Sequence, residues 1–245
     1  MARKLSEKAF LTDYNIHDFD VPLTSVDMAI FTVRDSKLQV LLVKRAQHPA
    51  LGFWALPGGF IDLKRDRTLA DTARRKLLEK TGVDTPYLEQ VESFGSRDRD
   101  PRGWSVTVAY LALIASEEIR LSRDGSSEEV AWVPVEKAEQ HFDLAFDHAE
   151  ILKSCHGRLT SKVQYTSLPV NLLPREFTLT ELQQTFEIVL GNSVEKKSFR
   201  RRILDADILE ETGNVKTGSN RPAKLYRVKA DGQSHFFARN IEGPR

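Results

Sequence analysis

The stretch Gly59–Val83, which reads GFIDLKRDRTLADTARRKLLEKTGV, decides the fold prediction for this chain of 245 residues. It directly follows Leu56-Pro57-Gly58, so a glycine turn leads into a charged loop. After the loop, apolar residues recur at helical spacing and share one face, namely Leu69, Ala73, Leu77 and Leu78. The stretch therefore predicts a glycine loop followed by an amphipathic helix over 69–80.

This segment resembles the Nudix box, in which a glycine loop precedes a helix that reads Arg-Glu-apolar-x-Glu-Glu-x-Gly-apolar. In that family the helix carboxylates share one face, where they hold Mg²⁺ against a pyrophosphate. Here two of the three carboxylate positions are Lys76 and Lys80, and only Glu79 remains. The upstream acidic position falls near residues 65–67, where the spacing is about two residues longer than the family pattern. The alternative is a chance match, but the flanking glycine turn and Thr81-Gly82-Val83 argue against it.

The two lysines change the chemistry that the box can support. Two unit charges about 4 Å apart interact by roughly 4 kcal/mol at an effective dielectric constant of ~20, so each ammonium group repels a divalent ion. Mg²⁺ also depends on carboxylates and substrate phosphates to stay bound. We therefore expect no catalytic residue, no metal ligand and no cofactor at this site.

The segments around the box predict a mixed sheet. Residues 26–33 and 38–43 are β-branched and apolar and flank a short polar turn, which indicates a hairpin. Further strands are expected over 53–56, 106–115 and 130–133, and Trp132 is assigned to the core. Strands covered by a helix after a glycine loop predict an α/β fold. From about residue 24 to 150 the chain resembles the Nudix fold, an α/β/α sandwich.

A polar loop over 94–104 carries the strongest candidate for ligand binding. On residue types alone it is equally compatible with a solvated hairpin loop. Its Asp100-Pro101-Arg102-Gly103, followed by an apolar strand, resembles a loop of Nudix proteins that handle ADP-ribose and of their regulator relatives. A guanidinium group matches a diphosphate bidentately, so Arg102 is the first candidate. The other ligand-binding candidates are Arg45, Arg97, Arg99, Phe53, Trp104 and Glu79, with Trp54 as a further stacking residue.

The histidines predict no catalytic or metal site. All six are scattered along the chain without ligand spacing, and no Ser-His-Asp arrangement stands out. His148 is assigned to the start of a helix over 145–164, whose apolar stripe contains Ile151, Leu152, Leu159 and Val163.

Beyond Pro169 and Pro174 the pattern predicts a helix-turn-helix. The first helix is expected to begin with Thr180 as N-cap and to end at Gly191. The second is expected to start at Asn192 or Ser193 and to run to residue 204, with Phe199, Ile203 and Leu204 buried. Residues 208–211 and 225–228 then bracket a long glycine-containing hairpin tip, which completes a winged version.

This C-terminal part is locally basic. Residues 191–229 contain ten basic and five acidic side chains, although the whole chain has a net charge of +1. The DNA-binding candidates are Lys196, Lys197, Ser198, Arg200, Arg201, Arg221 and Lys224. A basic helix in a protein–protein module is the alternative that the pattern leaves open.

Together, the altered box, the Asp100–Gly103 loop and the basic helix around Ser198–Arg201 resemble the NrtR family of Nudix-related transcriptional regulators. The resemblance implies a homodimeric repressor of NAD biosynthesis and salvage genes that binds palindromic double-stranded operator DNA and is released by ADP-ribose or a related nucleotide. A related branch controls sugar-use genes. It further implies a Nudix-like sensing domain over 1–150, a linker helix and connection over 151–175, and a winged helix over 176–245. The competing hypothesis is an active ADP-ribose pyrophosphatase with an accessory nucleic-acid module.

Composition sets the remaining expectations. The chain has a single cysteine, Cys155, which excludes an internal disulfide framework and fits a reducing compartment. The N-terminus has no apolar segment of a secretory signal, and no run approaches the ~18 apolar residues of a membrane span. We therefore expect a cytoplasmic protein with no membrane partner.

Overall fold

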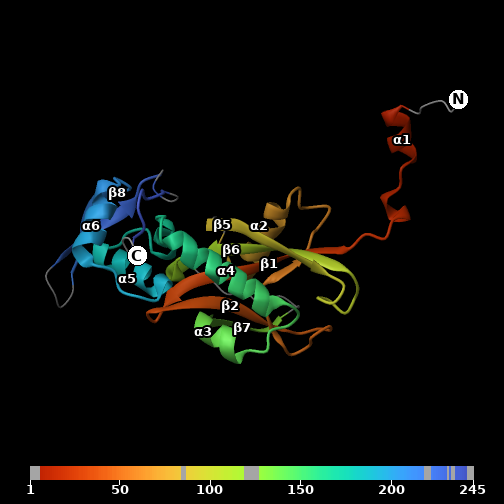
Figure 1. Ribbon diagram of the computed structural model, residues 1–245, viewed down its shortest axis with the longest axis horizontal. Helices are drawn as coiled ribbons and strands as arrows, with labels where there is room; N and C mark the ends of the chain where they lie inside the picture. The colour runs from red at the N-terminus through yellow and green to blue at the C-terminus, as the bar shows by residue number, and fades with distance from the viewer. Residues whose placement is uncertain are drawn as a thin grey trace.

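The computed structural model describes residues 6–83, 87–118, 127–217, 222–230, 232 and 235–241. An α/β sandwich makes up one part of the molecule, and a smaller winged helix lies at its other end (Figure 1). The architecture agrees with the expected Nudix-like sandwich followed by a winged helix-turn-helix. Within the described ranges, no helix is both long enough and apolar enough to cross a bilayer.

The sandwich is built on a mixed seven-stranded sheet. Its strands are β1 (Leu23–Arg34), β2 (Lys37–Arg45), β3 (Trp54–Ala55), β4 (Gly58–Phe60), β5 (Tyr87–Ser96), β6 (Ser105–Leu113) and β7 (Ser127–Pro134). The predicted hairpin is confirmed, since β1 and β2 pair antiparallel across a turn in which Asp35 and Ser36 both have positive φ. β1 also runs parallel to β6, from Leu23 opposite Ser105 to Phe31 opposite Leu113.

Helices cover both faces of the sheet. α2 (Leu69–Thr81) packs Ala73 and Leu77 against one face, where they join Met28, Ile30 and other buried strand residues. Leu78, which the spacing assigned to the same apolar face, is instead 45% exposed. α4 (His148–Val163) covers the other face with the four residues of its predicted stripe, all fully buried.

The start of α4 differs from the prediction by three residues. The amide of Ala145 donates to the carbonyl of Trp54, and Phe146 has a φ of 57°. Both features hold the chain outside helical geometry, so the helix begins at His148 rather than at Ala145. A similar difference occurs in the 94–104 segment, because β5 continues through Ser96 and leaves a shorter loop.

The winged helix contains α5 (Leu179–Leu190), α6 (Lys196–Asp205), β8 (Leu209–Lys216) and β9 (Ala223–Val228). The predicted N-cap of α5 is wrong. Thr178, not Thr180, accepts from the amide of Glu181, and the Glu181 carboxylate accepts from the amide of Thr178. The predicted end is right, since Gly191 has the left-handed conformation that closes the helix, with a φ of 74°.

Two further details of this unit correct the sequence prediction. α6 begins later than expected, at Lys196, because the carboxylate of Glu195 accepts from the amides of Lys197 and Ser198. Phe199 and Ile203 are buried as predicted, whereas Leu204 is 50% exposed. The wing strands are also longer than the predicted segments, so the hairpin tip between them is shorter.

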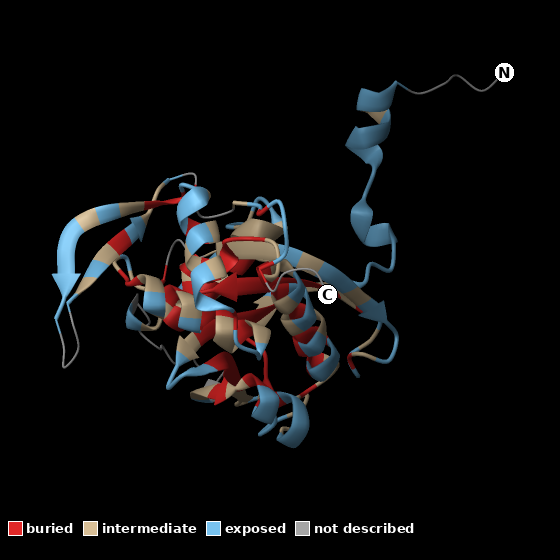
Figure 2. Ribbon diagram, turned by 60° about the vertical axis from the view of Figure 1, so that its left-hand side comes forward, coloured by how far each residue is buried: buried red, intermediate tan, exposed pale blue. Residues whose placement is uncertain are grey.

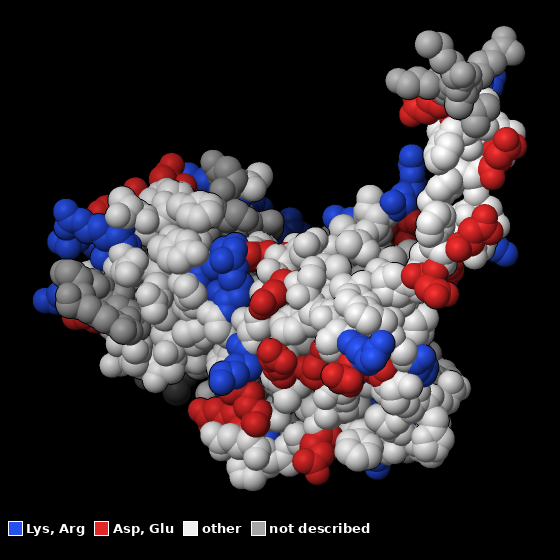
Figure 3. All heavy atoms as spheres, turned by 45° about the vertical axis from the view of Figure 1, so that its right-hand side comes forward, with Lys and Arg blue, Asp and Glu red and all other residues white. Residues whose placement is uncertain are grey.

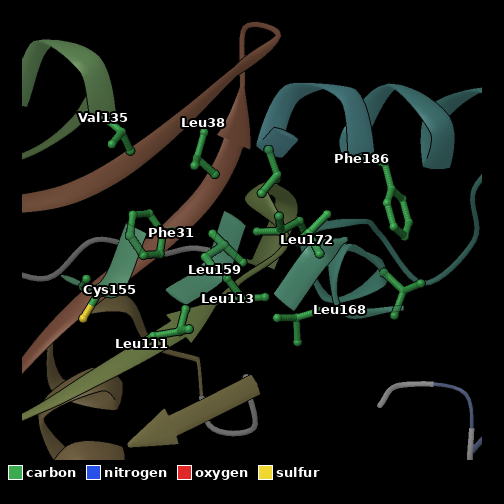
Figure 4. Close-up of a cluster of buried hydrophobic side chains, with 14 of the residues drawn as sticks. Phe31, Leu38, Leu111, Leu113, Val135, Cys155, Leu159, Leu168, Leu172 and Phe186 are labelled. Carbon is green, nitrogen blue, oxygen red and sulfur yellow. The ribbon is translucent and has the colours of Figure 1, made fainter. Parts of the chain in front are cut away.

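The winged helix shares a hydrophobic core with the sandwich. Phe31 and Leu113 of the sheet, Leu159 of α4, Leu172 and Phe186 belong to one cluster of buried side chains. Leu172 lies in η3 (Leu168–Leu172), which connects α4 to α5. Figure 4 shows these side chains converging from the sheet, α4, η3 and α5. The predicted linker helix, α4, therefore also packs as a layer of the sandwich.

The sequence prediction did not include α3 (Val135–His141), η1 (Ile16–Asp18), η2 (Ser116–Glu118) or an N-terminal helix, α1 (Glu7–Asp13). α1 and η1 form an arm that extends away from the sandwich (Figures 1 and 2). No residue of α1 is buried. The apolar side chains exposed along residues 6–23 are Phe10, Leu11, Tyr14, Ile16, Phe19, Val21 and Leu23.

Candidate functional site

A cavity of about 490 Å³ lies where the glycine loop, α2, the 97–104 loop and the start of α4 meet. We call it the cationic cavity. Its lining includes six cationic side chains, namely Arg45, Arg75, Lys76, Lys80, Arg99 and Arg102. Three carboxylates, Asp27, Asp62 and Asp100, also line it, together with Phe60, Phe146 and His148. This composition favours an anionic ligand that has an apolar or aromatic part.

The glycine loop is necessary for this arrangement. A Cβ atom at Gly58 would lie 2.1 Å from Oδ1 of Asp27, and one at Gly59 would lie 2.8 Å from Cε of Lys76. Gly59 also has a φ of 153°, which other residues rarely adopt. The two glycines therefore leave the space in which Asp27 and Lys76 reach the cavity.

An ion pair holds the charged loop against α2. The carboxylate of Asp66 accepts from Nε of Arg75 at 2.8 Å and from its Nη2 at 2.5 Å, and Thr72 donates to the same carboxylate. The hydrogen bonds from Arg75 lower the pKa of Asp66 well below its usual range. Asp66 lies within the stretch in which the family's upstream acid was sought, but the sequence prediction did not single it out. The sequence does contain a signal for this ion pair, because Asp66 is an acidic residue nine positions before Arg75, the arginine of the box.

The remaining box carboxylate, Glu79, is surrounded by cations. Its carboxylate oxygens lie 3.1 Å from Nζ of Lys76, 3.4 Å from Nη1 of Arg75 and 3.8 Å from Nη1 of Arg65. Lys80 is buried and lines the cavity. Within the described ranges, no three His, Cys, Asp or Glu side chains are grouped closely enough to hold a metal ion. The donor set of the box therefore does not fit a divalent cation.

Arg102, the first ligand-binding candidate of the sequence, lines the cavity. Its Nε and Nη2 donate to Asp100 at 3.0 and 2.6 Å, and its guanidinium group lies 5.0 Å from the centre of the Phe60 ring. The pair with Arg102 lowers the pKa of Asp100 and raises that of Arg102. Because the Arg102 side chain is still 42% exposed, one face of its guanidinium group remains available to a ligand.

Two other predicted arginines line the same cavity. Arg99 is nearly buried and donates to both carboxylate oxygens of Asp147, each at 2.8 Å, and it lies 3.6 Å from Asp27. Arg45 donates to the carbonyl of Pro49 and lies 4.9 Å from the ring centre of Phe146. Burial and the charge of Arg102 lower the pKa of Arg45. Arg99 is thereby fixed in place, and Arg45 has no carboxylate within ion-pair distance among the described residues.

The structure does not bring the other ligand candidates into the cavity lining. Arg97, Phe53, Trp104 and Glu79 all lie outside the set of lining residues. Phe53 and Trp104 are each about half exposed, and Trp104 packs against Gly95 of β5. Trp54 packs against Phe142 instead. Aromatic residues beside a ligand loop are a weak signal, since packing and stacking use the same side chains.

His148 is a cavity residue that the sequence assigned only to the start of a helix. It is the first residue of α4, so that assignment is confirmed. Its Nδ1 accepts from the amide of Leu56 at 2.8 Å, and its Nε2 lies 3.7 Å from Asp27. Burial lowers the pKa of His148, which keeps the ring neutral near pH 7.

The predicted DNA-binding residues lie on two elements. Lys196, Lys197, Ser198 and Arg201 belong to α6, and within the described residues the three cations form no ion pair with a carboxylate. On the face seen in Figure 3, lysine and arginine side chains gather at the winged-helix end of the molecule. Lys224 of β9 pairs with Glu211 at 2.9 Å. Arg221 lies outside the described residues.

Arg200 differs from its neighbours on α6. It is only partly exposed, and its Nη2 donates to the hydroxyl of Thr180 on α5. No described residue forms a hydrogen bond with its buried Nε. Arg200 therefore contacts the first helix of the pair, while Lys196 and Lys197 project into solvent.

Comparisons with known proteins agree with this two-part architecture. Residues 24–155 match the NUDIX domain, and residues 169–228 match the NrtR DNA-binding winged helix domain. The chain is 50% identical over 240 residues to the ADPR responsive transcriptional repressor NtrR of Acinetobacter baylyi, which covers 98% of this chain and 95% of the relative.

Two solved structures extend the comparison. The crystal structure of Shewanella oneidensis NrtR complexed with a 27mer DNA is 45% identical, with a TM-score of 0.83 over 89% of this chain and 99% of that one. The NUDIX domain of the same protein complexed with ADP ribose is 43% identical, with a TM-score of 0.59 over 63% of this chain and 99% of that one. This chain, which joins a NUDIX domain to an NrtR winged helix, belongs to the NrtR family.

Proposed function

We propose that this chain is an ADP-ribose-responsive transcriptional repressor. The observation that carries the proposal is the 50% identity, over nearly the whole of both chains, to a repressor that responds to the same nucleotide. The winged helix of this chain provides the DNA-binding part, with Lys196 and Lys197 on α6 directed away from the protein. The NUDIX domain provides the sensor.

The ligand that best fits the cationic cavity is ADP-ribose or a related nucleotide. Arg102 and Arg45 line the cavity with guanidinium groups suited to a diphosphate, and Phe60 and Phe146 supply aromatic surface beside them. The relative whose NUDIX domain was solved with ADP ribose has the same fold and 43% identity. These observations support binding of the nucleotide in this cavity.

The chain is a regulator that has lost Nudix hydrolysis. Lys76 and Lys80 occupy positions where the box requires carboxylates, and three cations surround Glu79. A sensor also gains from this loss, because it binds its signal without consuming it. ADP-ribose pyrophosphatase activity is the alternative, and the release of AMP distinguishes the two.

The proposed DNA target is a palindromic operator bound by a homodimer. A two-fold dimer that matches a palindrome doubles the contacts of one winged helix. Residues 6–23 support the dimer, because seven large apolar side chains are exposed along them and α1 buries none of its residues against its own chain. A second copy of the chain would cover this surface.

Two further parts of the proposal rest on the family resemblance. The regulated genes are those of NAD biosynthesis and salvage. The sensing domain spans residues 1–150, the connection 151–175 and the DNA-binding domain 176–245. Selection of bound genomic fragments, followed by sequencing, identifies the regulated genes directly.

The proposal is tested by measuring operator affinity with and without saturating ADP-ribose. We expect ADP-ribose to weaken operator binding roughly 5- to 150-fold, the usual range for coupling between two sites.

The mass of the operator complex should correspond to two chains, and ADP-ribose incubated with Mg²⁺ should release no AMP at an ordinary enzymatic rate. Arg102→Ala should reduce the response, whereas Arg34→Ala is the control, because Arg34 is exposed and does not line the cavity. Operator affinity that ADP-ribose leaves unchanged contradicts the sensor, and rapid AMP release favours the pyrophosphatase.

A further inference from the structure

We propose that Lys76 and Lys80 replace the divalent cation of a Nudix site, so that the cationic cavity binds the diphosphate of its nucleotide directly and without metal. The inference rests on the proposed function, and it assigns the two box lysines to ligand recognition. It also gives them a role beyond the loss of hydrolysis. The chemical class of the ligand is a nucleoside diphosphate ester.

The carboxylates of the box do not fit Mg²⁺. Mg²⁺ requires oxygen ligands in near-octahedral geometry. Glu79 is the box carboxylate that remains, and both of its oxygens are already within 4 Å of cationic nitrogens. Asp66, the acid of the charged loop, has only 2% of its side chain exposed, and Arg75 and Thr72 occupy its oxygens. Neither carboxylate is left to coordinate an ion.

Both box lysines lie in the wall of the cationic cavity, where a ligand can contact them. They are four residues apart on α2, so they share one helix face, and both line the cationic cavity. The stem of Lys76 passes directly beside Gly59, where any larger residue would collide with its Cε atom. About a fifth of the Lys76 side chain is exposed. The glycine turn of the box therefore lies beside an ammonium group.

The charge of the two lysines matches the charge of the proposed ligand. The diphosphate of a dinucleotide-type ester carries two negative charges near neutral pH, and two ammonium groups match them without a bridging ion. Arg75 and Arg99 also line the cavity, but their guanidinium groups are paired with Asp66 and Asp147. Arg102 adds a guanidinium group with a partly exposed face. Direct ammonium–phosphate contacts are charge-assisted hydrogen bonds, which are stronger than neutral ones.

A purely structural role for Lys76 is the competing explanation, because its ammonium group lies 3.1 Å from Glu79 on the same helix. In that case its replacement would lower stability and leave nucleotide affinity unchanged. The competing explanations are separated by measuring affinity and thermal stability on the same variants.

The experiment titrates the full-length protein with ADP-ribose by calorimetry, once in EDTA and once in excess Mg²⁺. We expect wild-type dissociation constants that agree within about twofold. Lys76→Met, which keeps the length of the side chain and removes its charge, should weaken binding at least about tenfold in both buffers. Lys64→Met is the matched control, since Lys64 lies exposed in the charged loop outside the cavity, and it should bind like wild type.

The wild-type comparison keeps the inference testable if Lys76→Met does not fold. Binding that requires Mg²⁺ and disappears in EDTA overturns it, as does Lys76→Met with unchanged affinity. Operator affinity measured in both buffers separates this inference from the proposed function. If ADP-ribose binds in EDTA but does not change operator affinity, the inference stands and the proposed function fails. If ADP-ribose releases the operator only in Mg²⁺, the proposed function stands and the inference fails.

Discussion

His148 shows at the scale of one residue how burial fixes a protonation state. Its ring forms part of the wall of the cationic cavity, and its Nδ1 accepts from the amide of Leu56, a bond that only the deprotonated nitrogen can make. Asp27 and Asp147 favour the protonated ring, while burial, Arg99 and Arg45 oppose it. Because burial has the largest effect, the pKa of His148 falls below its ordinary value of 6.5 in the folded protein.

This lowered pKa predicts a stability that decreases with acidification. As the pH falls through 6.5, the unfolded chain takes up a proton at His148 that the folded protein does not, so unfolding is favoured progressively. The slope for one proton is at most about 1.4 kcal/mol per pH unit. Urea unfolding at about pH 7.5 and about pH 5.5 measures the loss for wild type and for His148→Asn.

Asparagine keeps a side-chain acceptor for the Leu56 amide but does not titrate in this range. The His148→Asn variant should therefore lose less stability between the two pH values than wild type. The two proteins are identical at every other position, so the difference between them isolates His148. An equal loss in the two proteins would show that His148 does not carry this pH dependence.

At the residue scale, the cavity could be predicted only in part. Arg102 was identified because Asp100-Pro101-Arg102-Gly103 is a compact sequence signal. The partner that fixes Arg99, Asp147, is 48 residues away and becomes visible only in three dimensions. Phe53 and Trp104 were assigned to the same ligand because aromatic type alone does not tell a stacking residue from a packing residue.

At the scale of elements, α6 is the part of the winged helix whose charge is free to meet DNA. Three wing cations of the described residues are already paired within the protein, since Lys216 contacts Glu181, Lys224 contacts Glu211 and Arg227 contacts Glu210. DNA phosphates must displace those carboxylates before the wing contributes. Among the residues that the structure describes, no carboxylate forms an ion pair with Lys196 or Lys197, so we expect these two lysines to dominate the electrostatic part of the affinity.

Replacement of these lysines should therefore weaken operator binding. For Lys196→Ala or Lys197→Ala we expect a loss of ~1–3 kcal/mol if the side chain reaches a base edge. If the side chain contacts a phosphate instead, binding should weaken on all sequences, and the slope of log affinity against log salt should fall by about 1. Fluorescence anisotropy over a series of salt concentrations measures both quantities.

Lys153→Ala is a suitable control for this series, because Lys153 is an exposed lysine on α4 rather than on α6. It removes the same charge from the whole molecule. If Lys197→Ala and Lys153→Ala gave the same affinity and the same salt slope, α6 would not be the DNA-binding helix.

Helix boundaries show why element prediction was accurate in some places and not in others. Gly191 was correctly placed because a helix end with positive φ selects glycine. The start of α5 offered two threonines, and Thr178 is used because Glu181 follows it by three residues and completes the reciprocal cap. α3 was not predicted, since its seven residues are too few to show a clear apolar period.

At the scale of the whole molecule, the sensor and the DNA-binding unit are joined by a common core rather than by a flexible tether. Leu159 of α4 is fully buried in the cluster that also contains Leu172 and Phe186. α4 begins at the cationic cavity, which its first residue His148 lines, and it ends where η3 leads into the winged helix. Displacement at one end of this helix therefore acts on packed side chains at the other.

The shared core predicts that a cavity in α4 weakens both parts together. Leu159→Ala should lower the free energy of unfolding by roughly 2–5 kcal/mol, the usual cost of such a truncation in a packed core. Urea unfolding followed separately by a probe in the sandwich and a probe in the winged helix should give coincident transitions. Two separate midpoints, with only one shifted by the variant, would contradict a common core. Leu11→Ala in the exposed arm is the matched control, and we expect little change in the unfolding of the monomer.

Lys76, which lies beside Gly59, determines which concentrations in the cell this protein responds to. A receptor that needs a free divalent ion responds to two concentrations at once, that of the nucleotide and that of the ion. An ammonium group built into the polypeptide is always present at one equivalent and cannot be chelated by ATP, citrate or nucleic acid. The response of such a receptor depends on the nucleotide concentration alone, and it does not change with the concentration of free magnesium.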